Sequence, residues 1–164
     1  MVFHLPDNLH PNCGPIAWLL GTWRGNGHGD YPTIDKFSYG QELIFTHDGR
    51  PFFHYMARAW ITDDEGNRVR DAAIETGFLR CFDAGKVELL LTHNTGISEL
   101  WHGNAADGKM ELVTDAVMRS ESAKEVVAGK RIYGNVNSEL MYAYDMAAVG
   151  QPLTPHLWAR LQRA

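Results

Sequence analysis

The chain has 164 residues and a formal net charge of -5 at pH 7, with 45% hydrophobic and 21% charged residues. These values are typical of one globular domain, which we expect to extend over residues 1–164. Phosphates and anionic headgroups repel an acidic surface, so neither nucleic acid nor a membrane is expected as a partner. The two cysteines form no CxxC or CxxCH motif, which argues against a disulfide framework, a zinc site and covalent attachment of a cofactor.

The N-terminal segment has no basic stretch followed by an apolar run, so no signal peptide is predicted and a cytoplasmic location is the default expectation. One short N-terminal helical turn is predicted over residues 15–20. Its proline stands near the start, and Gly21 follows its last residue.

The rest of the chain consists of short stretches that alternate in polarity and are separated by turn-forming residues. Between residues 47 and 51, for example, Asp48 and Gly49 supply the backbone conformations that a tight hairpin requires. Strands are predicted over residues 21–29, 37–47, 52–61, 72–82, 87–93, 97–103, 110–119, 126–134, 139–149 and 156–162.

The short connections between these strands favour an all-β fold, because short loops join antiparallel neighbours and no segment can form a long crossover helix. About ten such strands predict an antiparallel up-and-down β-barrel, which closes on itself and leaves no exposed sheet edge. A barrel with this many strands is wide enough to enclose a ligand. An open β-sandwich is the alternative that the pattern leaves open.

The first predicted strand is unusually rich in glycine, with four glycines between Gly21 and Gly29. A phosphate-binding loop is excluded, because no helix start and no Lys-Ser or Lys-Thr pair follows. In a barrel, such glycines let a strand bend sharply or let a flat ligand approach the backbone. Both interpretations stay open, and Trp23 is expected to plug the floor of the barrel.

Eight histidines are present, and none forms an HxH or HxxxH pair. Most histidines in a domain of this kind are structural or exposed, but His156 opens the last strand directly after Pro155, at the expected barrel rim. A neutral imidazole there can ligate haem iron. Strict alternation, however, puts His156 on the same face as Trp158, so either Trp158 also lines the cavity or the strand is irregular at its start.

The motif Gly21-x-Trp23-x-Gly25-x-Gly27, followed by Tyr31-Pro32-Thr33, resembles the signature of the nitrobindins. The resemblance continues in order along nearly the whole chain. Further matches are Gly77-Phe78-Leu79-Arg80, His93-Asn94-Thr95-Gly96, Ala123-Lys124-Glu125-Val126, Gln151-Pro152-Leu153 and His156-Leu157.

The resemblance implies a ten-stranded barrel, related in shape to lipocalins and fatty-acid-binding proteins, with one haem b per chain in a solvent-exposed pocket. It implies that His156 is the axial ligand of the iron and the catalytic residue, and that Thr33 contacts the haem. A basic residue of the family is expected at Lys130, with Arg131 as the alternative. The implied activity is that of a ferric peroxynitrite isomerase, which forms nitrate and also binds nitric oxide.

Two rival functions stay open from the sequence. One is a nitric oxide carrier or sensor without physiological turnover, which needs the same iron site. The other is a lipocalin-like carrier of a small hydrophobic ligand. Peroxidase activity is disfavoured, because it needs a distal acid–base group, although His28, His54 and His93 have no assigned position. The oligomeric state is open, with a homodimer as the candidate assembly.

Overall fold

The computed structural model describes residues 2–164. It contains ten strands, a 3-10 helix η1 before the first strand, and a short 3-10 helix η2 between the fourth and the fifth. Their bounds are η1 Pro11–Leu19, β1 Gly21–Tyr31, β2 Ile34–Thr46, β3 Phe52–Thr62, β4 Arg68–Cys81, η2 Asp83–Gly85, β5 Lys86–His93, β6 Ile97–Ala106, β7 Lys109–Arg119, β8 Val126–Val136, β9 Glu139–Ala148 and β10 Thr154–Arg163.

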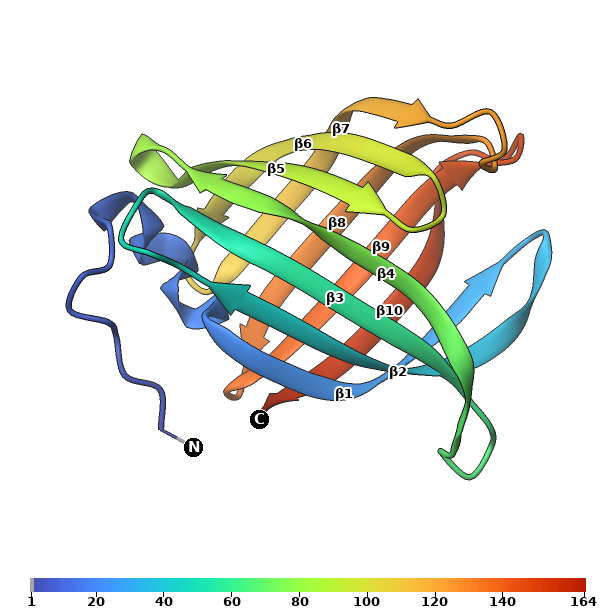
Figure 1. The fold of residues 1–164 in the computed structure, drawn as a ribbon, viewed down its shortest axis with the longest axis horizontal. Helices are drawn as coiled ribbons and strands as arrows, with labels where there is room; N and C mark the ends of the chain where they lie inside the picture. Colours follow the sequence, from blue (N-terminus) through green and yellow to red (C-terminus); the bar gives the residue numbers. More distant parts are fainter. Residues whose placement is uncertain (1) are drawn as a thin grey trace.

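The strands form one closed antiparallel barrel in which each strand pairs with its neighbours in sequence, and β10 closes the ring by pairing with β1 (Figure 1). The predicted up-and-down barrel is therefore confirmed, and the open sandwich is wrong. No helix among residues 2–164 is long and apolar enough to cross a membrane.

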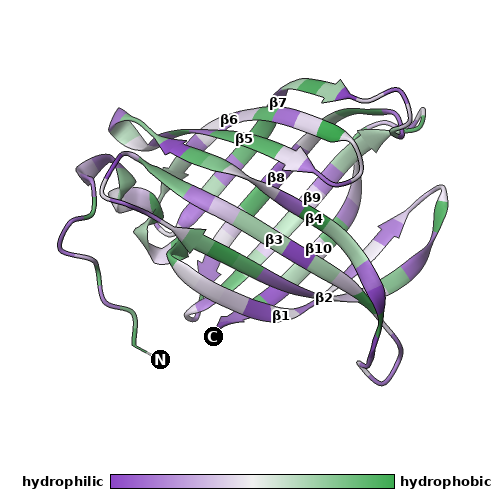
Figure 2. Cartoon of the chain, viewed as in Figure 1, coloured by the Kyte–Doolittle hydropathy of each residue, from purple (hydrophilic) through white to green (hydrophobic). Residues whose placement is uncertain are grey.

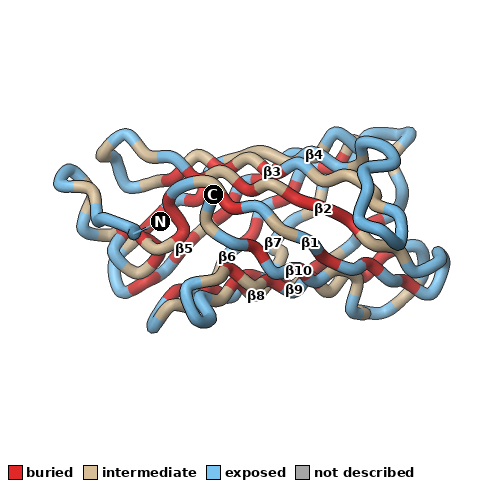
Figure 3. Tube along the Cα trace, turned by 90° about the horizontal axis from the view of Figure 1, so that it is seen from below, coloured by how far each residue is buried: buried red, intermediate tan, exposed pale blue. Residues whose placement is uncertain are grey.

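Alternation of side chains produces the core of the barrel. On β2, Tyr39, Leu43 and Phe45 are almost completely buried, whereas Glu42 and Ile44 are only partly buried. Green and purple segments accordingly alternate along the strands in Figure 2, and Figure 3 shows the buried stretches within the barrel and exposed loops at its ends. Burial of one face against the interior provides the main stabilisation of such strands.

Most strands extend beyond their predicted limits because strand pairing continues past the apolar residues. The strand predicted to begin at residue 72 begins at Arg68, which pairs with Thr62 of β3. Its first residues are exposed, so burial alone gives no signal for them.

The N-terminal helix also differs from its prediction, since it begins at Pro11 and contains Pro15. The side chain of His10 accepts a hydrogen bond from the Asn12 backbone N–H and so caps the first turn. Proline fixes φ near the value found in a 3-10 helix, and it lacks the backbone N–H that an α-helix needs for its regular hydrogen bonds. Trp23 donates a 2.8 Å hydrogen bond to the Leu19 carbonyl and is 1% exposed, in agreement with its predicted place in the barrel floor.

Candidate functional site

A β-bulge aims His156 at the interior of the barrel. Pro155 pairs with Asp145 of β9 and Leu157 pairs with Tyr144, so His156 is an extra residue with no partner on that strand. The bulge turns both His156 and Leu157 inward, while Trp158 stays half-exposed on the outer face. The strand is therefore irregular at its start, as the second sequence interpretation states, and Trp158 also lines the wider cavity at the mouth, as the first one states.

The local contacts of His156 fix the tautomer of its imidazole. Nδ1 lies 3.0 Å from the backbone carbonyl oxygen of Asp30, and a carbonyl only accepts, so Nδ1 carries the proton. Nε2 then presents an unprotonated lone pair, and among the described residues no hydrogen bond uses it. Burial lowers the pKa of His156 below its ordinary value of 6.5, although the Asp30 contact opposes this shift. The imidazole is therefore neutral at pH 7.

Three aromatic rings hold this imidazole in place at the barrel mouth. The ring centroids of Tyr31, Tyr144 and Phe37 lie 5.4, 5.8 and 6.4 Å from that of His156, all in edge-to-face arrangements. Such contacts restrict rotation of the imidazole and direct its free nitrogen.

His156 stands between two adjoining cavities. The inner one has a volume of about 190 Å³ and lies within the barrel. The outer one, of about 1010 Å³, opens at the mouth. Phe37, Ile61, His156 and Leu157 line both cavities. Small side chains widen one wall of the inner cavity, namely Ala57, Ala59, Ala72 and Ala73.

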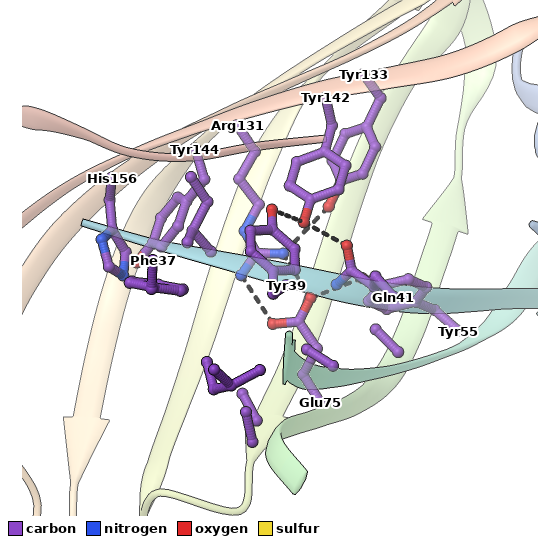
Figure 4. Close-up of a pocket in the computed structure, with 16 residues that line it drawn as sticks. Phe37, Tyr39, Gln41, Tyr55, Glu75, Arg131, Tyr133, Tyr142, Tyr144 and His156 are labelled. Carbon is purple, nitrogen blue, oxygen red and sulfur yellow. Dashed lines mark hydrogen bonds and ion pairs between the residues drawn. The ribbon is translucent and has the colours of Figure 1, made fainter. Parts of the chain in front are cut away.

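A buried ion pair crosses the inner cavity from β8 to β4 (Figure 4). The Nη1 and Nη2 atoms of Arg131 donate to the two carboxylate oxygens of Glu75 at 2.7 and 2.9 Å. The Arg131 guanidinium lies between the rings of Trp101 and Tyr144, with its Cζ 4.9 and 4.8 Å from their centroids. Burial raises the pKa of Glu75, but the charge and hydrogen bonds of Arg131 outweigh it and hold this pKa at about 2.

Tyrosine hydroxyls complete the polar part of the inner cavity. Tyr55 donates to Glu75 at 2.6 Å, and Arg131 donates to the Tyr133 hydroxyl at 3.1 Å. Farther along the wall, the hydroxyls of Tyr39 and Tyr142 lie 2.7 Å apart, and Tyr142 donates to Gln41. Because these groups are paired with one another, the cavity is polar without carrying an unpaired charge.

The three histidines without an assigned position are now placed, and none resembles His156. His28 is exposed on β1, lines the outer cavity and lies against Trp158 with the rings tilted and a centroid distance of 4.9 Å. His54 lies against Thr76, 3.1 Å from its hydroxyl. His93 points inward, but its Nδ1 lies 3.3 Å from Glu75 and its Nε2 contacts Glu99. Both ring nitrogens of His93 are thus occupied by carboxylates.

The other predicted contact residues lie outside the two cavities. Thr33 is exposed in the turn between β1 and β2 and lines neither cavity. Lys130 also lines neither, although its partner in the strand register, Asp145, lines the outer one. Alternation along β8 puts Arg131 inside, where it is 5% exposed. The contacts of Thr33 and Lys130 with haem stay predictions.

The glycines of β1 make room for neighbouring side chains of the barrel. A Cβ atom on Gly27 would lie 2.3 Å from the Trp158 carbonyl oxygen and 2.6 Å from Cζ of Tyr39. One on Gly29 would lie 2.0 Å from the Phe37 ring. The structure thus favours the interpretation in which these glycines shape the barrel.

We therefore expect Gly27→Val to lower the free energy of unfolding of the ligand-free protein by roughly 3 kcal/mol, because the new side chain overlaps backbone as well as a ring. Urea unfolding measures this, with Asn26→Val on the exposed face of the same strand as the matched control. A Gly27→Val protein of native stability that had lost its ligand would instead support close approach of the ligand to the backbone.

Sequence reasoning missed Glu75, Gln41 and the tyrosines of the inner cavity. Gln41 alternates with apolar residues on one face of its strand, and Glu75 lies on a strand whose alternation is weak. One usable signal existed, since tyrosines at positions 142 and 144 alternate on one strand and must share a face.

Comparison with known proteins identifies the class of barrel. A family model described as THAP4-like, heme-binding beta-barrel domain matches residues 12–163. A protein of Nocardioides sp. named peroxynitrite isomerase is 74% identical over 163 residues, covering 99% of each chain. A ferric nitrobindin-like protein of Streptomyces griseus subsp. griseus is 41% identical, covering 99% of this chain and 86% of that protein.

The fold comparison agrees with the sequence comparisons. The crystal structure of Rv2717c from M. tuberculosis superposes with a TM-score of 0.86 at 39% identity, covering 95% of this chain and 99% of the other. The resemblance to the nitrobindins is confirmed, and so is haem as the cofactor of the family.

Proposed function

The chain belongs to the THAP4-like heme-binding beta-barrel family, and from this premise we propose that it is a ferric haem b protein that isomerises peroxynitrite to nitrate. His156 is the proposed axial ligand, with one haem per chain. The observation that carries this proposal is the imidazole of His156. Its Nδ1 is fixed by the Asp30 carbonyl, and its Nε2 is left free beside a cavity.

The residues around His156 fit a haem. The Nδ1 hydrogen bond to a backbone carbonyl is the usual support of a metal-ligating histidine, because it fixes the tautomer and orients the ring. The lowered pKa keeps the lone pair available, since ligation requires the neutral imidazole. Phe37, Ile61 and Leu157 form an apolar wall next to it. The outer cavity is large enough for a cofactor of this class.

When bound, haem would supply the iron chemistry of the reaction, and the chain's own residues would define its surroundings. His156 would hold the iron. The apolar wall excludes water from that side of the site. Arg131 and Glu75 form a fixed ion pair at the inner cavity, and their charges neutralise each other. The inner cavity therefore has no mobile charge that could draw the anionic substrate away from the iron. Thr33 and Lys130 are the proposed contacts at the edge of the cofactor.

Binding of nitric oxide by the same iron is part of this proposal, and so is the second candidate function of a nitric oxide carrier. Both would use the iron that His156 is proposed to hold. They differ in turnover, since a carrier need not accelerate the conversion of peroxynitrite.

Reconstitution with haemin tests the proposal. We expect a Soret band that saturates at one haem per chain, and accelerated decay of peroxynitrite with nitrate as the main product. The same chain without haem is the control and should leave the decay at the uncatalysed rate.

Each alternative gives a different result in this experiment. A colourless protein that binds no haemin and copurifies with a fatty acid would support the lipid carrier. A haem protein that binds nitric oxide but leaves peroxynitrite decay unchanged would support the nitric oxide carrier.

A further inference from the structure

The two cysteines, 68 positions apart in the chain, meet at the closed end of the barrel. Cys13 belongs to η1 and is 0% exposed, and Cys81 is the last residue of β4 and is 3% exposed. Their sulfur atoms lie 3.1 Å apart, and both thiols are free. A disulfide requires the sulfurs to be ~2.05 Å apart, so an approach of about 1 Å would bring them to bonding distance.

The environments of the two thiols are unequal. Burial raises the pKa of both, but the hydrogen bond with Cys81 opposes the rise at Cys13, whereas the contact with Cys13 adds to the rise at Cys81. Cys13 is therefore the first of the two to lose its proton. It also belongs to the more easily detached element, because a short 3-10 helix is less firmly held than a strand in a closed sheet.

We propose that Cys13 and Cys81 are an oxidisable pair, which a hydroperoxide converts into a disulfide that fastens η1 to the end of β4. When η1 moves away from the end of β4, Cys13 meets solvent and loses its proton, and its thiolate attacks one peroxide oxygen and breaks the O–O bond. Cys13 becomes a sulfenic acid, and the other oxygen leaves as an alcohol or as water after it takes a proton. The Cys81 sulfur then attacks the Cys13 sulfur and forms the S–S bond, and the sulfenic oxygen leaves as water. Two thiols and one hydrogen peroxide thus give one disulfide and two waters.

The disulfide would stabilise the closed end of the barrel without reaching the site at the mouth. Trp23 pairs with Arg163 near η1, and Gly29 pairs with Leu157 beside His156, so the same strand pair spans both ends. Six residues of strand separate these positions, which corresponds to about 20 Å. Figure 1 shows η1 and the tip of the β1–β2 hairpin at opposite ends. Closing a loop of this length should raise the melting temperature by roughly 10 °C.

The test treats the full-length chain, with and without haem, with hydrogen peroxide under native conditions. Peptides are then mapped after alkylation in denaturant. We expect a Cys13–Cys81 linked peptide that has lost two hydrogens, a melting temperature higher by roughly 10 °C, and reversal of both by dithiothreitol. Met118, which is 74% exposed, reports by its own oxidation that the peroxide has acted.

Cys13→Ala and Cys81→Ala are the matched controls, and neither should show the rise in melting temperature. If a variant fails to fold, the presence or absence of the linked peptide in the oxidised unaltered chain still tests the proposal. Recovery of both thiols unoxidised after Met118 has been oxidised would overturn the proposal, and so would their separate conversion to sulfinic acids. Neither outcome depends on peroxynitrite turnover, so the proposed function is tested independently.

Discussion

His156→Ala is expected to fold normally and to lose stable haem binding together with peroxynitrite turnover. The side chain is half-buried at the barrel mouth and makes one hydrogen bond, so its removal should change the free energy of unfolding of the ligand-free chain by less than about 1 kcal/mol. The proposed main role of His156 is to bind the haem iron. If the loss of the iron–imidazole bond reduces the binding free energy of haem by about 3 kcal/mol, haem affinity falls roughly 100-fold. Haemin titration followed at the Soret band measures this.

Two companion measurements make the interpretation specific. Free imidazole should partly restore the haem spectrum of His156→Ala, because the space left by the side chain can accept it. His102→Ala, on the exposed face of β6 and outside both cavities, should bind haem normally. A His156→Ala protein with an unchanged Soret band and full turnover would show that another residue is the ligand, and His93 would be the next to test.

Glu75→Gln is expected to cause the largest loss of stability, because it leaves the Arg131 guanidinium buried without its counter-ion. Removing one partner of a buried ion pair costs roughly 4 kcal/mol, which lowers the melting temperature by roughly 10 °C in a domain of this size. Urea unfolding of the ligand-free chain measures it. Glu42→Gln is the matched control, since Glu42 pairs with the exposed Arg24 and should contribute less than about 1 kcal/mol.

The pH dependence of this effect follows from the pKa of Glu75. That pKa falls from an ordinary 4.5 to about 2 in the folded protein. A carboxylate with a lowered pKa stabilises the fold fully above pH 4.5, and this contribution disappears as the pH falls from 4.5 to about 2. The shift corresponds to about 3 kcal/mol. The stability difference between the unaltered chain and Glu75→Gln should therefore narrow over that interval. A difference that stays constant between pH 7 and pH 3 would contradict the ion-pair explanation.

Substituting both members of the pair separates charge from packing. Glu75→Leu combined with Arg131→Met removes both charges, and such replacements of buried pairs are often neutral for stability. We expect the double variant to be more stable than Glu75→Gln. If it were less stable, the hydrogen bonds of this pair with Tyr55 and Tyr133 would be the more important contribution.

The sequence by itself determined the strands and their antiparallel order, and it singled out His156 as the candidate ligand. Alternation of polarity has a period of two residues and is a local property, so residues such as Leu43 and Phe45 reveal the buried face of β2 without any knowledge of its partners. Short turns then leave few ways to connect the strands. The barrel and its closed end could be predicted for this reason, and the family motifs added the cofactor.

Only the tertiary structure decided how the site is assembled. The inward direction of His156 depends on a bulge, which arises from the pairing of β10 with β9 and breaks the local alternation. Arg131 and Glu75 lie 56 positions apart and meet only because the barrel closes. Gly27 and Gly29 of β1 are explained by the rings of Tyr39 and Phe37 on the next strand. Contacts between strands have no period in the sequence, so the local pattern cannot specify them.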